Sequence, residues 1–243
     1  MERLVAALQN AASVFVLTGS GISAESGLPT FRGVGGLWRT HRVEALASPE
    51  GFARDPTLVW TWYNERKAAH ENAKPNAGHY ALAQIERQLQ NVVVATQNVD
   101  SLHLRAGSAN VLELHGNLRE ARCTHCAARR ALDGTGLPLD EIEHACGGRL
   151  RPDIVWFGEP LPPEAWRKAE LAASRADVIL VIGTAAVVYP AAALATHYNA
   201  DAFVAEINPE KTAISDRVDY VMRHGAAQAL PQLADALARG AER

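Results

Sequence analysis

The stretch Val-Phe-Val-Leu-Thr-Gly-Ser-Gly-Ile-Ser-Ala-Glu-Ser-Gly-Leu-Pro, residues 14–29, decides the fold that we expect for this chain. Residues 14–18 are apolar or β-branched without interruption, which is typical of a strand buried on both faces of a parallel sheet. Three glycines follow with the spacing G-x-G-x5-G. Such a turn between a buried strand and a helix can bring backbone N–H groups against a pyrophosphate, and the alternative is a purely structural turn. The spacing differs from the G-x-G-x-x-G of dehydrogenases.

The same alternation continues along the chain. Further strands are expected at residues 91–96, 178–182, 203–207 and, more weakly, 219–222, and helices at residues 4–11, 78–89, 163–173, 189–198 and 228–238. Buried strands that alternate with helices are typical of βαβ units. The sequence therefore predicts an α/β fold with a Rossmann-like parallel sheet covered by helices on both faces.

Two segments interrupt this alternation. Residues 34–74, approximately, are rich in aromatic residues and helical in pattern, and residues 119–150 hold all three cysteines. We expect these two insertions to form a small lobe. The large part would then comprise approximately residues 1–33, 75–118 and 151–243, and the whole chain, 1–243, would act as one catalytic unit.

Composition excludes several classes of protein. The 243 residues carry a formal net charge of -3, so no basic excess points to a nucleic-acid partner. With 48% hydrophobic and 21% charged residues, the composition excludes a disordered chain, a collagen and a coiled coil.

The uncharged stretch 178–195 is interrupted by Gly183-Thr184 and Tyr189-Pro190, which indicates a strand, a turn and a helix start in place of a membrane span. Residues 1–10 lack a signal-peptide pattern. We expect a cytoplasmic monomer.

Polar residues follow the strand at 91–96. Gln97, Asn98 and Asp100 would lie at the carboxyl edge of the sheet, where open parallel sheets bind ligands, although Asn and Asp are also common turn residues. His115 stands between Leu114 and Gly116. A single histidine is more often structural than catalytic, but an imidazole with a pKa near 6.5 suits proton removal at neutral pH.

Six motifs follow one another along the chain: Gly19–Arg32, Thr96–Asp100, Leu114–Gly116, Gly183-Thr184, Tyr189–Ala191 and Ile207-Asn208. In this order they resemble the sirtuin family of NAD-dependent protein deacylases over nearly the whole chain. Two positions depart from the family pattern: Ser20 stands where most sirtuins have Ala, and Ala185 where Ser is usual. Both replacements are small for small, so we expect a changed affinity and no loss of function.

The resemblance implies that NAD is a consumed co-substrate. The acyl oxygen of the substrate attacks C1′ of the nicotinamide ribose and expels nicotinamide; His115, the implied general base, then deprotonates the ribose hydroxyls. The products are free lysine, nicotinamide and 2′-O-acyl-ADP-ribose. Asn98 is the second implied catalytic residue. The implied NAD contacts are Gly19, Ser20, Gly21, Ser23, Ala24, Thr30, Phe31, Arg32, Trp38, Gln97, Asn98, Asp100, Gly183, Thr184, Ala185, Asn208, Glu210 and Ala226.

The resemblance also implies a substrate site for acyl-lysine side chains of proteins. Val155, Trp156, Phe157 and Gly158 correspond to the sirtuin strand that pairs with the substrate peptide, with core packing as the alternative.

Tyr63 and Arg66 share one face of an expected helix, where a hydroxyl beside a guanidinium suits a carboxylate. The Tyr-x-x-Arg pair resembles the mark of the class III sirtuins, which remove succinyl, malonyl and glutaryl groups. The alternatives are mainly deacetylation, mono-ADP-ribosylation at the same NAD site, or a non-catalytic binding module.

The cysteines predict a structural zinc site with an irregular fourth ligand. Cys123 and Cys126 have the spacing of half a zinc knuckle, and Cys146 follows after 19 residues. The fourth cysteine of the family is missing. Glu143 has the better spacing and His144 the better chemistry, while His125 lies inside the first knuckle. We favour His144 as the fourth ligand, and a metal-free lobe is the alternative.

Overall fold

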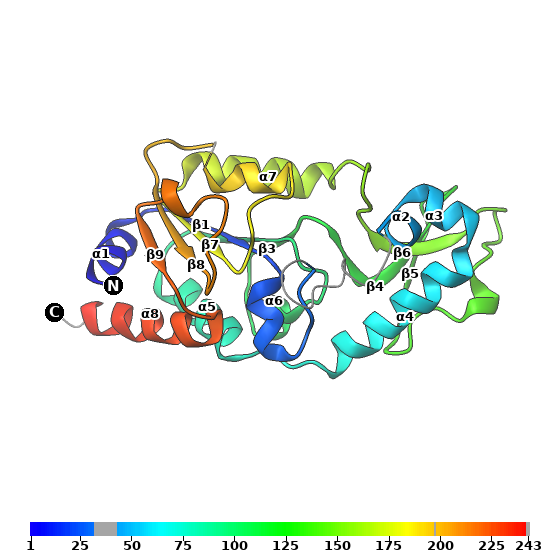
Figure 1. Cartoon of the computed structure of the whole chain (residues 1–243), viewed down its shortest axis with the longest axis horizontal. Coiled ribbons are helices and arrows are strands. Elements are labelled where there is room, and N and C mark those ends of the chain that lie inside the picture. Colours follow the sequence, from blue (N-terminus) through cyan, green and yellow to red (C-terminus); the bar gives the residue numbers. More distant parts are fainter. Residues whose placement is uncertain (32–42, 197, 242–243) are drawn as a thin grey trace.

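A six-stranded parallel sheet forms the centre of the large part of the molecule (Figure 1). The computed structural model describes residues 1–31, 43–196 and 198–241. The strand order is β3-β2-β1-β7-β8-β9, so the chain leaves the central strand β1 in one direction and later returns to its other side. The strands are β1 (Val14–Thr18), β2 (Val92–Thr96), β3 (Val111–Glu113), β7 (Val178–Ile182), β8 (Phe203–Ile207) and β9 (Tyr220–Met222).

Helices cover both faces of this sheet, as the sequence predicts. Alternate residues of β1 enter two separate cores: Val14 and Val16 pack with one helical layer, and Phe15 and Leu17 with the other. The first layer contains α1 (Glu2–Asn10), α5 (Ala77–Gln88) and α8 (Ala226–Ala241), and the second contains α7 (Pro163–Arg175). Burial on both faces explains why β1 has no polar alternation.

The small lobe contains an antiparallel sheet of order β5-β4-β6. Its strands are β4 (Gly116–Cys123), β5 (Arg129–Ala131) and β6 (Leu150–Ile154), so the sheet begins before residue 119 and ends after residue 150. The helices α2 (Val43–Leu46), α3 (Pro49–Arg54) and α4 (Pro56–Asn72) pack against it. Trp60 on α4 is buried and donates from Nε1 to the Leu150 carbonyl at 2.7 Å, which fixes α4 on the sheet.

One local expectation is wrong: of the helix expected at 189–198, the described residues form only a 3₁₀ helix, Ala191–Ala195. A helix follows the glycine turn as expected, and it is a seven-residue 3₁₀ helix, Ser20–Ser26. No pattern in the sequence indicates β3, because three half-buried residues are too short a segment to show one. Across the described ranges, no helix has both the length and the apolar character that a membrane crossing requires.

Truncation of a residue in the sheet core should cost much more stability than truncation of the same residue type on the surface. Leu180 on β7 is 0% exposed, whereas Leu171 on α7 is 42% exposed. Leu180→Ala should lower the free energy of unfolding by about 2–5 kcal/mol, and Leu171→Ala by about 0.5 kcal/mol or less. Urea unfolding measures both, and equal losses would contradict the core assignment.

Candidate active site

Two glycine turns meet backbone to backbone at the carboxyl ends of β1 and β7. The Gly21 N–H donates to the Gly183 carbonyl at 2.8 Å, and the Gly19 N–H donates to the Ile182 carbonyl at 3.0 Å. A Cβ on Gly21 would lie 2.7 Å from the Gly183 Cα, and Gly183 itself has a φ of +60°. Side chains are therefore excluded from this contact, so the two backbones lie against each other at the point where the strand order reverses.

A cavity of about 610 Å³ opens at this edge and extends to the small lobe. Ser23, Asp100 and Ala226 lie outside its lining; the neighbour of Ala226, Gly225, takes part instead. Arg32 and Trp38 fall outside the described residues. The predicted residues that line the cavity are Gly19, Ser20, Gly21, Ala24, Thr30, Phe31, Tyr63, Arg66, Gln97, Asn98, His115, Val155, Trp156, Phe157, Gly158, Gly183, Thr184, Ala185, Asn208 and Glu210.

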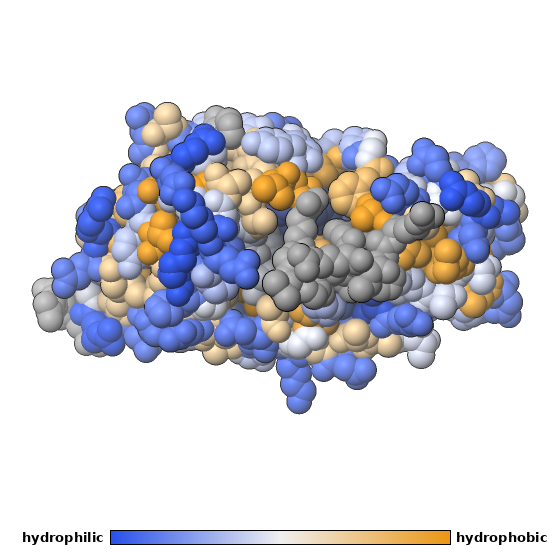
Figure 2. All heavy atoms as spheres, viewed as in Figure 1, coloured by the Kyte–Doolittle hydropathy of each residue, from blue (hydrophilic) through white to orange (hydrophobic). Residues whose placement is uncertain are grey.

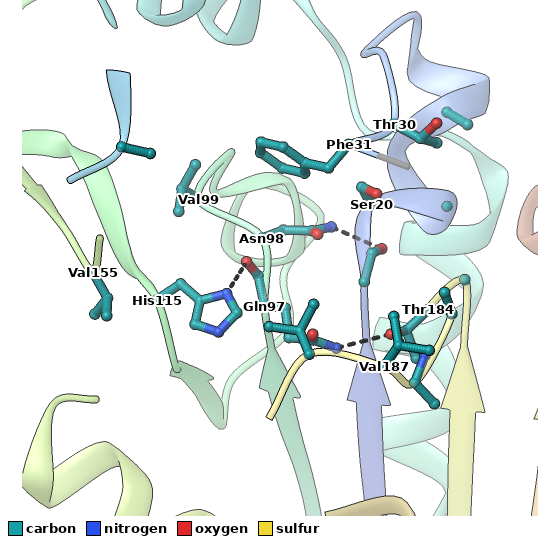
Figure 3. Close-up of a pocket in the computed structure, with 18 of the residues that line it drawn as sticks. Ser20, Thr30, Phe31, Gln97, Asn98, Val99, His115, Val155, Thr184 and Val187 are labelled. Carbon is teal, nitrogen blue, oxygen red and sulfur yellow. Dashed lines mark hydrogen bonds between the residues drawn. The ribbon is translucent and has the colours of Figure 1, made fainter. Parts of the chain in front are cut away.

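The side-chain amides after β2 connect this strand with its neighbours. Asn98 is buried and donates from Nδ2 to the Gly19 carbonyl at 3.1 Å and to the Ser23 hydroxyl at 3.2 Å. Gln97 donates from Nε2 to the Thr184 hydroxyl at 3.1 Å (Figure 3). Both amides are thus oriented before any ligand enters.

His115 projects into the cavity between Val155 and the Gln97 segment (Figure 3). Its Nδ1 lies 3.0 Å from the Gln97 carbonyl, which can only accept, so Nδ1 carries the proton and Nε2 is left basic. Burial lowers the pKa of His115 below its ordinary value, and the hydrogen bond to Gln97 opposes this shift. The imidazole is therefore neutral at physiological pH, as a general base must be.

Asp100 stands behind the cavity wall in a buried polar network. Its carboxylate accepts from the Ser23 hydroxyl at 2.7 Å and from the Leu102 N–H at 2.9 Å. Burial raises the pKa of Asp100, while these hydrogen bonds and the positive charge of Arg66 oppose the shift. The network continues to His79, whose Nε2 lies 3.4 Å from Ser23 Oγ. Sequence reasoning missed His79, because it stands on α5, where nothing but its polarity among apolar neighbours marks it.

The far end of the cavity is bounded by a loop that an ion pair holds between the exposed Arg223 and the buried Glu206. Asn208 donates from Nδ2 to the Thr184 carbonyl at 3.1 Å. Arg223 donates to the carbonyls of Asn208 and Glu210 at 3.2 and 3.0 Å, and to the fully buried Glu206 at 2.8 Å. Sequence reasoning also missed Glu25, which lines the cavity and accepts from the Ala227 N–H at 2.8 Å at the start of α8.

The segment 155–158 differs from the expected strand. β6 ends at Ile154, and the Val155 N–H donates to the His115 carbonyl at 2.9 Å. Trp156 is 2% exposed and belongs to the core of the small lobe, so only its edge reaches the cavity, whereas Phe157 is 46% exposed. Apolar surface lies over both the large part and the small lobe in Figure 2.

Comparison with known proteins decides the family. A family model described as "Sir2 family" matches residues 19–190. The chain is 52% identical over 228 residues to a Pyrobaculum aerophilum protein named NAD-dependent protein deacylase 2, covering 92% of this chain and 90% of that protein. It is 46% identical to a Thermus thermophilus protein named NAD-dependent protein deacylase, covering 96% of this chain and 94% of that protein. The chain belongs to the Sir2 family.

Solved sirtuin structures share the fold. A Sir2 homologue mutant in complex with ADP ribose matches at a TM-score of 0.95 with 41% identity, over 100% of this chain and 98% of that one. A Sir2 homologue in complex with NAD matches at 0.91 with 42% identity, over 99% of this chain and 94% of that one. Sir2Tm bound to a propionylated peptide matches at 0.84 with 29% identity, over 100% of this chain and 99% of that one.

The small lobe of this sirtuin brings four metal-binding side chains together. Cys123 Sγ lies 3.4 Å from Cys146 Sγ, Cys126 Sγ lies 3.7 Å from His144 Nδ1, and His144 Nδ1 lies 3.1 Å from Cys146 Sγ. All four donor atoms lie within 4.8 Å of one another. A tetrahedral zinc ion with bonds of about 2.0–2.3 Å needs donors separated by about 3.3–3.8 Å. The cluster therefore fits a structural zinc ion.

The structure selects His144 over Glu143 as the fourth ligand. The Glu143 carboxylate accepts from Arg149 Nε at 2.8 Å, and its backbone pairs with Arg149. Because side chains of adjacent residues in an extended segment point to opposite sides, Glu143 turns away when His144 turns inward. His125 does not belong to the cluster.

Removal of the implied base should separate binding from catalysis. His115→Ala removes the basic Nε2 but none of the loop contacts, so turnover should fall roughly 10²–10⁴-fold while NAD affinity stays within a few-fold. Because burial lowers the pKa of His115, the wild-type kcat/KM should decline with falling pH only below its ordinary value of 6.5. Kinetics and NAD titration measure both effects, and near-normal turnover of the variant would exclude His115 as the base.

Loss of a zinc ligand should act on folding. Cys123→Ser and His144→Ala should reduce bound zinc below one ion per chain and lower the melting temperature, because metal binding of this kind contributes to folding. Glu143→Ala, at the neighbouring position, should retain the metal. Elemental analysis with thermal unfolding checks this, and equal zinc content in the two variants at 143 and 144 would contradict the ligand assignment.

Proposed function

We propose that this sirtuin, an NAD-dependent protein deacylase, preferentially removes acyl groups that end in a carboxylate from lysine side chains. Succinyl and malonyl groups would be the main substrates, glutaryl a further one, and acetyl a weaker one. The observation that carries the proposal is the placement of Arg66 in the same cavity as His115. The names of its relatives, NAD-dependent protein deacylase, support the class of reaction.

No salt bridge joins Arg66 to a carboxylate among the described residues, and among carboxylates only the charge of the more distant Asp100 acts on its guanidinium. Its guanidinium lies between two aromatic rings, with Cζ 4.9 Å from the centroid of Phe31 and 4.8 Å from that of Trp62. Burial lowers the pKa of Arg66 from its ordinary value, and the charge of Asp100 and the Tyr63 oxygen oppose the shift. Stacking leaves the guanidinium edge, with its N–H donors, for an incoming anion.

Tyr63 offers a second donor beside Arg66. Trp156 Nε1 donates to the Tyr63 hydroxyl at 3.0 Å, which fixes the oxygen and leaves the O–H proton for another acceptor. Burial raises the pKa of Tyr63 to about 12, so the hydroxyl stays protonated at neutral pH. A carboxylate between these two groups would gain charge-assisted hydrogen bonds, which offset the cost of removing it from water.

The remaining roles follow from the cavity. The backbone at Gly19–Gly21 and Gly183 would approach the pyrophosphate of NAD, and Asn208 and Glu210 would border its adenosine half. Gln97, Asn98 and Asp100 would orient the nicotinamide and its ribose, with Asn98 close to the reacting carbon. His115 would accept the ribose proton at Nε2. The segment Val155–Gly158, in which Phe157 and Gly158 are exposed, would contact the substrate peptide.

Replacement of Arg66 should change the acyl preference. Arg66→Met removes the charged donors but keeps an apolar stem, so kcat/KM for a succinyl-lysine peptide should fall roughly 10- to 150-fold. The acetyl version of the same peptide should be turned over as well or better. Tyr63→Phe should shift the preference in the same direction by less, because one neutral donor is lost and the ring stays.

Arg54→Met, on the exposed end of α3, serves as the matched control and should leave both substrates unchanged. Equal losses on both substrates in Arg66→Met would make Arg66 structural and favour a deacetylase. Nicotinamide release with ADP-ribosylated protein and no free lysine would instead identify a mono-ADP-ribosyltransferase.

A further inference from the structure

Ser101 adopts a backbone conformation that favours glycine. It follows Asp100 directly and has a φ of +63°. In an L-residue this left-handed conformation brings Cβ against the backbone and persists only where neighbouring groups hold it. The turn at Ser101 directs the Leu102 N–H back to the Asp100 carboxylate, 2.9 Å away. One of the two hydrogen bonds that orient the Asp100 carboxylate therefore depends on the strained residue that follows it, and the other comes from Ser23.

Arg119 is hydrogen-bonded to the residue at this turn. It stands on β4 of the small sheet and donates from Nη1 to the Ser101 hydroxyl. Its two terminal nitrogens also donate to the two carboxylate oxygens of Glu113, each at 2.6 Å. This fork-to-fork pairing fixes the plane of the guanidinium.

Glu113 places the same guanidinium beside the second functional segment. It is the last residue of β3 and pairs with Thr96, the last residue of β2. His115 lies two residues further along and contacts the Gln97 carbonyl at 3.0 Å. Arg119 thus joins the end of the 97–101 segment to the strand that delivers His115.

We propose that Arg119 is a positioning residue for the deacylation reaction: it holds Ser101 in the left-handed conformation and thereby fixes Asp100 and the 97–100 segment relative to His115. The inference rests on the proposed NAD-dependent deacylation but not on the acyl preference. Arg119 is absent from the cavity lining and touches no site for a substrate. Its side chain is 42% exposed, and an ion pair so exposed contributes little to global stability.

The test uses glycine to remove the strain. Arg119→Met should lower kcat/KM about 5- to 50-fold, equally for succinyl- and acetyl-lysine peptides, and should weaken NAD binding measured by calorimetry. Ser101→Gly alone should stay near wild type. The double variant Arg119→Met/Ser101→Gly should recover both readouts to within about 3-fold of wild type, because glycine adopts a φ of +63° without support.

Two further variants test whether the effect is specific to Arg119 and its pairing with Glu113. Arg130→Met removes an arginine of similar exposure, 43%, from the neighbouring strand β5, where it pairs with Glu141, and should change neither readout. Glu113→Gln keeps the arginine but loosens it, and should give a smaller loss that Ser101→Gly also relieves.

The outcomes separate this inference from the proposed acyl preference. Full activity and NAD affinity in Arg119→Met, or a loss that Ser101→Gly does not restore, overturns the positioning role. A lower melting temperature with unchanged kinetic constants would also overturn it, because Arg119 would then be only structural. A wild-type enzyme that prefers acetyl-lysine would overturn the acyl proposal alone, since the effect of Arg119 is measured on either peptide and on NAD binding.

Discussion

The close approach of two backbones at the carboxyl ends of β1 and β7 is the constraint on which the cavity depends. Gly21 and Gly183 touch without side chains between them, at the position where the strand order reverses. Any larger residue at Gly21 or Gly183 would push the two turns apart, because a Cβ at either position would clash with the backbone of the other turn. The amides of Gln97 and Asn98 bond to the same turns, so this side of the cavity takes its shape from the contact.

The small lobe presents the other wall of the cavity. A cluster of metal-binding side chains lies at one end of its sheet: Cys123, Cys126, His144 and Cys146. The hydrogen bond from Trp60 to the Leu150 carbonyl fixes α4 on the same sheet. Because α4 bears Tyr63 and Arg66, a metal-binding cluster remote in sequence from both residues lies on the same lobe that positions them.

Arg66 on α4 and Asp100 after β2 interact electrostatically across the two parts of the molecule. The interior of the cavity sets the cation of Arg66 near the buried carboxylate of Asp100, and each reduces the shift that burial causes in the pKa of the other. Removal from water gives an unpaired charge a high free energy, whether it is the cation of Arg66 or the carboxylate of Asp100. Arg66 on α4 and the polar network around Asp100 are thus electrostatically coupled across the two parts of the molecule.

The sequence by itself determined the parallel sheet, because strands buried on both faces need uninterrupted apolar runs such as residues 14–18. It also determined the family, through the order of its motifs, and most of the cavity lining, because residues after such strands gather at one edge. Two features could not be predicted from the sequence: β3, and the short 3₁₀ helix that is present where a longer helix was expected at 189–198. Such short segments show too weak a periodicity. Only the tertiary structure decided that His144 and not Glu143 joins the cysteines, that His79 supports Ser23, and that Arg119 supports Ser101. These choices depend on contacts between distant segments, which local patterns do not encode.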